Sequence, residues 1–264
     1  MIDTHCHLDL DAFAADRDAM VERAVAAGVV GMLVPAIRPR TWAALVELVG
    51  RHAAQGMRCA LGIHPQIVPE LASDEIDGDL AERIARAVEE AGAIAIGECG
   101  LDGGTGDLER QQAIFRAHLR AAHALDRPVV IHVLRAHDLA PRILREEGRV
   151  RGVLHSYSGG ADLVPVYRDL GMAFSFAGPV SYPNARRPVE AARAIDASLL
   201  LVETDAPDQA PEGHRGGRSE PAFLPAVIAG LAAARQETVE DIATRTTANA
   251  LRIFGGWPPA RSFL

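Results

Sequence analysis

Histidine and acidic side chains recur at one kind of position in this 264-residue sequence, at or just after the ends of short apolar segments. The residues at these positions are His5, His7, His64, Glu98, His132, His155 and Asp205. Imidazole nitrogens and carboxylate oxygens are ligands for divalent transition metals. A metal ion lowers the pKa of a bound water toward neutrality, and that water can attack an ester or a phosphodiester. The residue types therefore indicate metal-assisted hydrolysis.

His5 and His7 are separated by one residue at the first apolar segment. Alternate residues of a strand share a face, so both imidazoles point the same way and Cys6 points to the opposite face. One strand can thus donate two ligands to one ion. The pair alone is equally typical of two hydrogen-bonded histidines lining a barrel. The further candidates in order along the chain favour a metal site, because unpaired polar groups are costly to bury together.

The sequence contains no lysine. Its absence excludes a Schiff-base lysine, a phosphate-loop lysine and a carboxylated lysine that bridges two metal ions. Glu98 is then the acid at a central strand end that can bridge two cations. We therefore expect a two-metal site with a bridging glutamate.

Short apolar or β-branched runs alternate with segments of helical periodicity about eight times along the chain. The predicted strands are residues 2–7, 29–35, 58–63, 93–97, 129–132, 152–155, 173–176 and 199–203. The predicted helices are residues 16–27, 41–54, 80–91, 108–125, 139–147, 163–170, 187–194, 221–234 and 238–254. The last helix begins with Thr238 and Asp241 in capping-box spacing and ends at Gly255-Gly256-Trp257-Pro258.

This element order predicts an α/β fold, a (β/α)8 TIM barrel with an additional C-terminal helix. The alternative, an open doubly wound sheet, usually carries a glycine fingerprint after its first strand, and residues 4–9 do not resemble one. No repeat or linker divides the chain, so we expect a single domain over residues 1–264. A barrel carries its chemistry at the carboxyl ends of its strands, where the candidate ligands lie.

Composition narrows the class of protein further. The net charge is −8, which argues against a protein that coats duplex nucleic acid through a broad basic face. The 48% apolar and 23% charged residues exclude disorder and coiled coil. The longest apolar run, residues 29–37, is shorter than the span of about 18 to 20 residues that a bilayer needs, and the first residues lack a signal pattern. We expect a cytoplasmic protein with no membrane partner, in which Cys6, Cys59 and Cys99 are packing residues.

Several short motifs resemble the TatD family, from the first residues to about Phe254. They are Asp3-Thr-His-Cys-His-Leu-Asp9, Gly62-Ile-His-Pro65, Gly97-Glu-Cys-Gly-Leu-Asp102, Pro128-Val-Val-Ile-His132, His155-Ser-Tyr-Ser-Gly159, Glu203-Thr-Asp-Ala-Pro207 and His214-Arg-Gly-Gly-Arg-Ser-Glu-Pro221. The resemblance implies a metal-dependent hydrolase of the amidohydrolase superfamily with a TIM barrel and 3′ to 5′ exonuclease activity on DNA.

The resemblance also implies a ligand set. One metal ion is held by His5, His7, Glu98 and Asp205, and a second by Glu98, His132 and His155. His64 matches a family histidine that contacts the scissile phosphate. Two divalent ions are expected, and Zn, Mn or Fe suit these ligands better than Mg, which prefers oxygen.

Substrate contacts depart from the family pattern. Arg135 stands one position later than the arginine that commonly follows the strand-five histidine, which weakens the case for a phosphate contact. Arg215 and Arg218 remain after strand eight, where each can bind a phosphate oxygen or anchor the following helix. The expected partner is the 3′ end of a nucleic acid or a small phosphodiester or ester. Nothing in the sequence sets the oligomeric state, and a monomer is compatible with it.

The mechanism expected for these residues assigns the proton transfers to two side chains. Asp205 takes a proton from the attacking water, and His64 holds or protonates the oxygen across from it. We expect Glu203 to pair with an arginine and Asp102 to stabilise its loop.

The remaining histidines lack partners in register. His52, His118 and His123 are interpreted as solvated or satisfied helix residues, and His137 stays undecided.

Two other functions stay open from the sequence. An ester or amide hydrolase, for example a D-aminoacyl-tRNA deacylase, would use the same metal ions to attack a carbonyl carbon. A non-catalytic metal-binding protein is less favoured, because every ligand position is kept.

Overall fold

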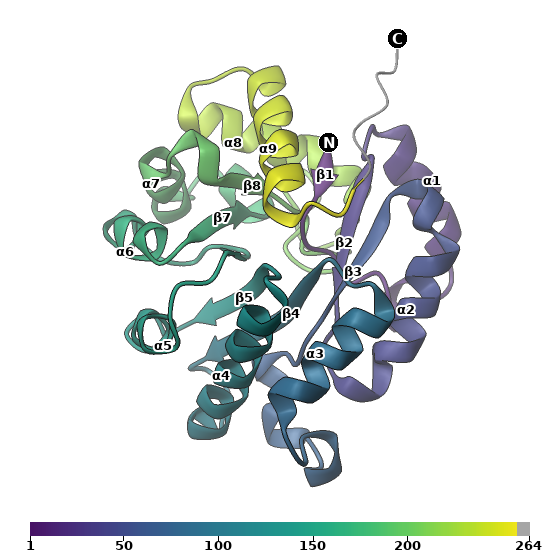
Figure 1. Cartoon of the computed structure of the whole chain (residues 1–264). Helices are drawn as coiled ribbons and strands as arrows, with labels where there is room; N and C mark the ends of the chain where they lie inside the picture. Colours follow the sequence, from purple (N-terminus) through teal and green to yellow (C-terminus); the bar gives the residue numbers. More distant parts are fainter. Residues whose placement is uncertain (258–264) are drawn as a thin grey trace.

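Eight parallel strands form one sheet in which each strand pairs with the next, in the order β1 to β8. The strands are β1 (Ile2–Asp3), β2 (Gly31–Pro35), β3 (Met57–Leu61), β4 (Ala95–Asp102), β5 (Val129–Leu134), β6 (Gly152–Leu154), β7 (Met172–Phe176) and β8 (Leu200–Val202). Hydrogen bonds from Thr4 N–H to Val202 O and from Asp205 N–H to His5 O, at 3.1 and 2.9 Å, join the two edges into a nearly closed barrel. The computed structural model describes residues 1–257 (Figure 1).

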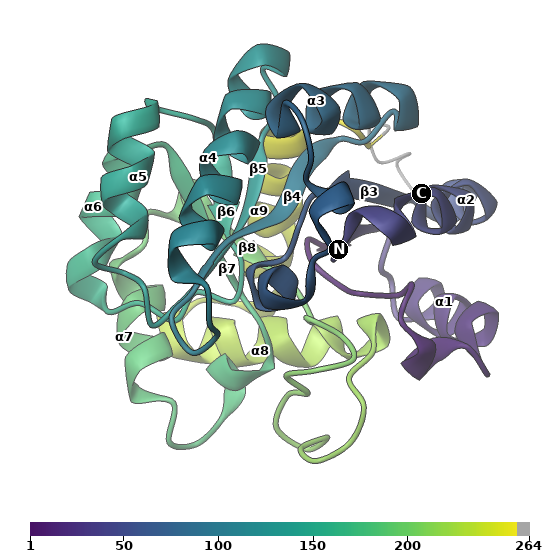
Figure 2. The same cartoon turned by 90° about the horizontal axis from the view of Figure 1, so that it is seen from below.

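Helices follow the strands and surround the barrel. They are α1 (Arg17–Ala26), α2 (Trp42–Arg51), α3 (Leu80–Ala91), α4 (Leu108–Leu125), α5 (Ala140–Glu147), α6 (Val164–Asp169), α7 (Arg186–Ala194), α8 (Leu224–Arg235) and α9 (Val239–Phe254). Figure 2 shows the strands at the centre with α1 to α8 around them. The predicted (β/α)8 barrel with a further C-terminal helix is therefore confirmed. Within residues 1–257, no helix combines the length and the apolar character that a membrane crossing needs.

One layer of side chains fills the barrel at the end away from the candidate ligands. Each strand contributes one buried residue to it: Ile2, Leu33, Ala60, Ala95, Val130, Val153, Ala173 and Leu201. Phe254 of α9 and Trp257 pack against this layer and cover it. Because alternate residues of a strand share a face, the next inward positions are His132 on β5, His155 directly after β6 and Glu203 directly after β8. The apolar layer thus forms the floor of the polar site.

A larger apolar cluster lies between the barrel and its helices. Phe115 of α4 is fully buried in it. Replacing Phe115 by alanine is expected to lower the free energy of unfolding by about 3 to 5 kcal/mol, because the lost burial and the remaining cavity both destabilise the fold. Urea denaturation followed by circular dichroism measures the change. Val25→Ala is the control, since Val25 is 46% exposed and its removal should change stability by about 0.5 kcal/mol or less.

The structure differs from the predicted elements mainly at strand ends. The β1 ladder stops at Asp3, not at His7, although Thr4 N–H still bonds Val202 O on the β8 side and Cys6 N–H bonds Leu33 O on the β2 side. Strand β4 continues to Asp102 beyond the predicted end at Gly97, after a register shift against β5.

The predicted boundaries of the last helix are largely confirmed. Thr238 caps α9 by accepting a hydrogen bond from Asp241 N–H at 3.0 Å, although its hydroxyl rather than its own N–H bonds the Asp241 carboxylate. Gly255 ends the helix with a φ of +66°, a left-handed conformation that suits glycine. Pro258, the last residue of the predicted stop signal, lies outside the described residues.

Candidate metal centre

The candidate ligands converge at the carboxyl ends of the strands, beside a cavity of about 610 Å³. Glu98 lies on β4 and His132 on β5, and the others follow β1, β3, β6 and β8. The ligand candidates that line the cavity are His7, His64, Glu98, His132, His155 and Asp205. His5 lies deeper and is fully buried.

Glu98 occupies the centre of the site, and its two carboxylate oxygens face different groups of histidines. Oε2 lies 3.1 Å from His5 Nε2 and 3.3 Å from His7 Nε2. Asp205 Oδ1 completes this first group, at 3.6 Å from His5 Nε2 and 4.0 Å from His7 Nε2. These contacts bring together the residues that the sequence assigned to one ion.

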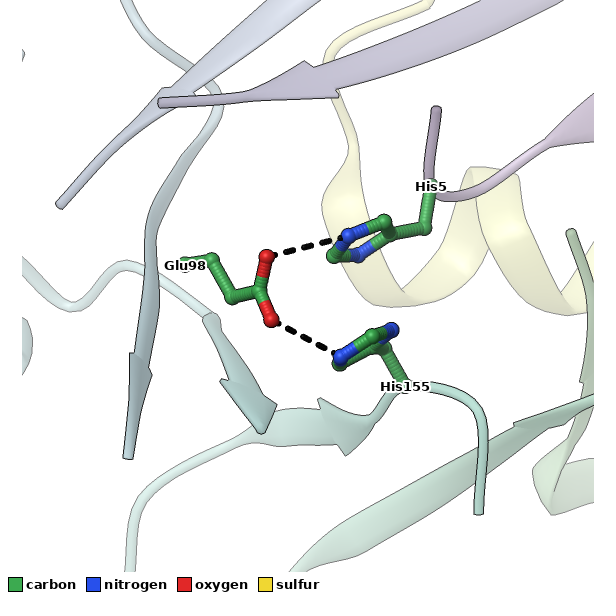
Figure 3. A group of neighbouring side chains, drawn as sticks. All are labelled: His5, Glu98 and His155. Carbon is green, nitrogen blue, oxygen red and sulfur yellow. Dashed lines mark ion pairs between the residues drawn. The ribbon is translucent and has the colours of Figure 1, made fainter. Parts of the chain in front are cut away.

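The second oxygen of Glu98, Oε1, faces three imidazoles. It lies 2.8 Å from His155 Nε2, 3.1 Å from His132 Nδ1 and 2.9 Å from His64 Nε2. Figure 3 shows His5 and His155 on opposite oxygens of this one carboxylate. Such an arrangement is what a carboxylate that bridges two metal ions requires.

His64 lies beside the ligand cluster as well as at the cavity. The sequence assigned it to substrate, whereas here it lies in the same triad as Glu98 and His132. The local backbone explains this, because His64 Nδ1 accepts a hydrogen bond from Gln66 N–H at 3.1 Å and the ring then turns Nε2 toward Glu98. His64 also lines the cavity, so it faces both the ligand cluster and the space for substrate.

The donor set fits divalent metal ions. His5 Nε2 and His7 Nε2 approach to 3.1 Å, and His132 Nδ1 and His155 Nε2 to 3.0 Å. Two nitrogens at this separation match neighbouring ligands of one ion, which sit about 3.3 Å apart when each is about 2.0 to 2.1 Å from zinc. Glu98 Oε2 is also buried without a hydrogen-bond partner among the described residues. A bound cation would explain both the unpaired buried oxygen and the two close pairs of imidazole nitrogens.

The metal-free cluster holds a buried negative charge on Glu98, and although burial lowers the pKa of His7, its contact with Glu98 raises that pKa to about 9. Burial raises the pKa of its carboxyl group, but the imidazoles of His64, His155 and His5 outweigh burial and hold this pKa well below its usual value. Burial lowers the pKa of His5 to about 3, so its imidazole is neutral and offers a lone pair. Burial also raises the pKa of Asp205 to about 6. An ionised central carboxylate beside a neutral imidazole is the state in which both can bind a metal ion.

Within residues 1–257 Glu203 pairs with no arginine, so the expectation of an arginine partner was wrong there. Its carboxylate is fully buried, accepts a hydrogen bond from Ser156 N–H at 2.5 Å and lies 3.5 Å from His155 Nδ1. The reason is its inward position on the β8 segment, which points it at a ligand histidine rather than at the surface. Glu203 therefore orients His155.

Asp102 does stabilise its loop, as the sequence indicated. It accepts hydrogen bonds from Gly104 N–H and from the Gln66 side chain, both at 2.7 Å. It also lies 3.5 Å from His132 Nε2. The same carboxylate thus supports a second ligand histidine.

The arginines expected at the substrate lie away from the cavity lining. Arg218 bonds both oxygens of Asp16, at 2.7 and 2.8 Å, which ties the loop after β8 to the start of α1. Arg215 lies over the ring of Tyr182, 4.2 Å from its centroid. Arg135 is exposed beside Gly104. A phosphate contact by Arg218 would require its pairing with Asp16 to break.

His118 is a satisfied helix residue and His123 is exposed, as the sequence predicted for these two. His118 is fully buried, bonds Ile114 O through Nδ1 at 2.7 Å and accepts a hydrogen bond from Ile63 N–H at 3.0 Å. This contact fixes the residue before His64. His137, which the sequence left undecided, contacts Tyr167 and Ser158.

The expected packing of the cysteines beside the ligands is confirmed. Cys6 and Cys99 are buried in the apolar cluster between barrel and helices. Their thiols lie toward Leu33 O and Val130 O, away from the ligand cluster.

Sequence reasoning missed two polar residues of the site, Ser156 and Gln209. Both line the cavity and bond each other. Both have left-handed backbone, with φ of +41° and +51°, which is uncommon outside glycine, asparagine and aspartate. Ser156 stands in the motif of residues 155–159, which assigned it no role, and Gln209 lies outside every motif that the sequence offered.

Comparisons with known proteins by family profile, by sequence and by structure all find similar proteins over nearly the whole chain. A family profile described as TatD related DNase matches residues 2–255. The uncharacterized metal-dependent hydrolase YjjV of Escherichia coli K12 is 33% identical over 96% of this chain and 97% of that protein. The 3′-5′ ssDNA/RNA exonuclease TatD of Pantoea ananatis is 31% identical over 97% of this chain and 99% of that protein. The crystal structure of YjjV superposes with a TM-score of 0.88, at 31% identity, over 97% of this chain and 98% of that one.

Proposed function

Because this chain belongs to the TatD-related DNase family and is a metal-dependent hydrolase, we propose that it is a 3′ to 5′ exonuclease that removes nucleotides from single-stranded nucleic acid. The observation that carries this proposal is the central carboxylate of Glu98, whose two oxygens face separate histidine groups. A relative that carries the name 3′-5′ ssDNA/RNA exonuclease supports the reaction class.

We assign two divalent ions to the site. His5, His7, Glu98 and Asp205 hold the first, and Glu98, His132 and His155 hold the second, with His64 beside it. When bound, the ions supply Lewis acidity, which activates a water molecule and offsets the charge of the reacting phosphate. Imidazole and carboxylate ligands favour Zn, Mn or Fe over Mg.

The proton transfers fall to Asp205 and His64. Asp205 is buried at the cavity wall, so its carboxylate can accept a proton from a water held in the site. Nδ1 of His64 accepts the Gln66 N–H, and its Nε2 therefore carries the proton in the neutral ring. That N–H lies 2.9 Å from Glu98 Oε1, and it can be donated to a substrate oxygen at the cavity once Glu98 binds the ions instead.

The cavity suits one nucleotide at a chain end. Leu10, Ile37 and Ile67 supply apolar walls, and Gln66 and Ser158 supply hydrogen-bonding groups. No arginine among the described residues lines it, so the anionic charge of the substrate must be balanced by the two ions. Exonuclease action on one strand end needs few further phosphate contacts, which agrees with a net charge of −8.

The same lack of arginine in the described lining favours a second candidate, hydrolysis of an ester such as the aminoacyl bond of a D-aminoacyl-tRNA. Asp208 is exposed at the cavity and places a negative charge where a substrate ammonium group could bind. The metal ions would then polarise a carbonyl instead of a phosphoryl group.

One experiment separates these candidates. The protein is stripped with a chelator, reloaded with Mn²⁺ or Zn²⁺, and given a 5′-labelled linear single-stranded oligonucleotide. We expect stepwise shortening from the 3′ end, and a loss of rate of about a thousandfold in the stripped protein, because the ions supply several kcal/mol of transition-state stabilisation.

Two comparison substrates set the controls. A circular oligonucleotide of the same sequence has no end and should stay intact. Cleavage of the circle would contradict exonuclease action. Hydrolysis of a D-aminoacyl-tRNA together with an intact linear oligonucleotide would establish the second candidate instead.

A further inference from the structure

The side chain of Gln209 joins two residues of the site. Its amide nitrogen Nε2 donates to Asp205 Oδ2, and its oxygen Oε1 accepts a hydrogen bond from Ser156 Oγ at 2.8 Å. Gln209 lies on the loop after β8 and Ser156 follows β6, so this amide connects two separate strand ends. It holds no position in the proposed ligand set.

The contact decides which oxygen of Asp205 faces the ligands. With Oδ2 occupied by the amide, Oδ1 lies toward His5 Nε2 and His7 Nε2 at 3.6 and 4.0 Å. A carboxylate without this contact can rotate about its side-chain torsions and present either oxygen. The amide therefore fixes a single orientation of the group.

The same link reaches the second histidine group through the backbone. Ser156 N–H donates to Glu203 Oε1, and Glu203 lies 3.5 Å from His155 Nδ1. Gln209 thus couples the position of Asp205 to the loop that carries His155. Ser156, Asp205 and Gln209 all have positive φ, between +41° and +51°. Such backbone persists only where surrounding contacts hold it.

We propose that Gln209 is a positioning residue for metal binding, which holds Asp205 with Oδ1 directed at the first ion. The inference rests on the proposed ligand role of Asp205. A glutamine suits this task because its amide donates and accepts at once and stays neutral. A glutamate would place a second carboxylate against Asp205, and an apolar residue would make neither bond.

The test uses Gln209→Met, which keeps the length of the side chain and removes both hydrogen bonds. We expect the affinity of the metal-stripped protein for Mn²⁺, measured by electron paramagnetic resonance titration, to fall about 10- to 100-fold, as for other residues that orient metal ligands. In the loaded enzyme, kcat should fall by a similar factor with KM changed by about twofold or less.

A second variant keeps the test decisive if Gln209→Met folds poorly. Ser156→Ala removes only the hydroxyl that holds the amide oxygen, and a smaller loss of Mn²⁺ affinity is expected. The double variant should bind Mn²⁺ within about twofold of Gln209→Met alone, because both changes remove one shared contact.

Gln236→Met is the matched control. Gln236 has the same residue type and a left-handed backbone, with φ of +59°, but it caps the carboxyl end of α8 and is exposed there. The Mn²⁺ affinity of the Gln236→Met variant should equal that of the wild-type protein. An equal loss in Gln236→Met would overturn the proposal, because the effect would then come from substitution in left-handed backbone.

Asp205→Asn in the same titration separates this inference from the proposed function. Weakened binding by Asp205→Asn with unchanged binding by Gln209→Met overturns the positioning role alone. Unchanged binding by Asp205→Asn overturns the ligand role of Asp205, and the positioning role with it.

Discussion

Glu98→Gln is expected to lose both metal ions and to lower turnover by about a thousandfold or more. The glutamine has nearly the same shape but no negative charge, and its amide nitrogen cannot bind a cation. Because each oxygen of Glu98 faces a different histidine group, one substitution should impair both groups. A loss of about 4 kcal/mol of transition-state stabilisation corresponds to this rate. Metal content by mass spectrometry and turnover on the oligonucleotide measure the two effects.

Glu220→Gln is the control for this substitution. Glu220 is 8% exposed and pairs with Arg23 at 2.6 Å, so its replacement removes a buried carboxylate outside the cavity. It should keep full metal content. Retention of one ion per chain by folded Glu98→Gln would contradict the bridging role, since the two groups would then bind independently.

The ligands could be predicted from the sequence because topology brings them together. In a parallel barrel every strand ends at the same rim, so residues far apart in sequence meet there. His5 and Asp205 are 200 positions apart, yet the hydrogen bond from Asp205 N–H to His5 O joins their backbones. The alternation of faces then turns His132 and His155 inward, whereas Glu98 lies at the register shift of β4 against β5. The absence of lysine supplied the remaining step, the choice of Glu98 as the bridge.

The partners of the ligands could not be predicted in the same way. Glu203 was expected to pair with an arginine because buried carboxylates need a cation, but the sequence does not say which cation lies nearest. In the fold, His155 supplies it. Similarly, the sequence left open whether Arg218 contacts the substrate or another part of the protein. Its partner in the fold, Asp16, is 202 residues away in the sequence.

The role of Gln209 lies beyond any pattern in the sequence. A polar residue on a loop predicts only exposure to solvent. Its function depends on the left-handed conformations of Ser156 and Asp205, which set the distance that its side chain spans. Backbone conformation of non-glycine residues is the least predictable part of this site, because it is imposed by the surrounding contacts.

Asp205→Asn is expected to lower kcat by about a thousandfold, within the range of about 10² to 10⁴ for a lost general base. The asparagine amide fills the same space at the cavity wall but cannot accept the proton of the attacking water. One ligand of the first ion is weakened as well, since Oδ1 no longer carries charge toward His5 and His7. Steady-state kinetics at saturating Mn²⁺ separate the two effects, because excess metal restores occupancy and leaves the missing base.

The matched control is Asp196→Asn, an exposed acid that precedes β8 at the opposite end of the strand. Its turnover should stay within about twofold of the wild type, as for most surface substitutions. A folded Asp205→Asn that regains wild-type kcat at high Mn²⁺ would show that Asp205 acts only as a ligand. The water proton would then have to pass to another group that lines the cavity.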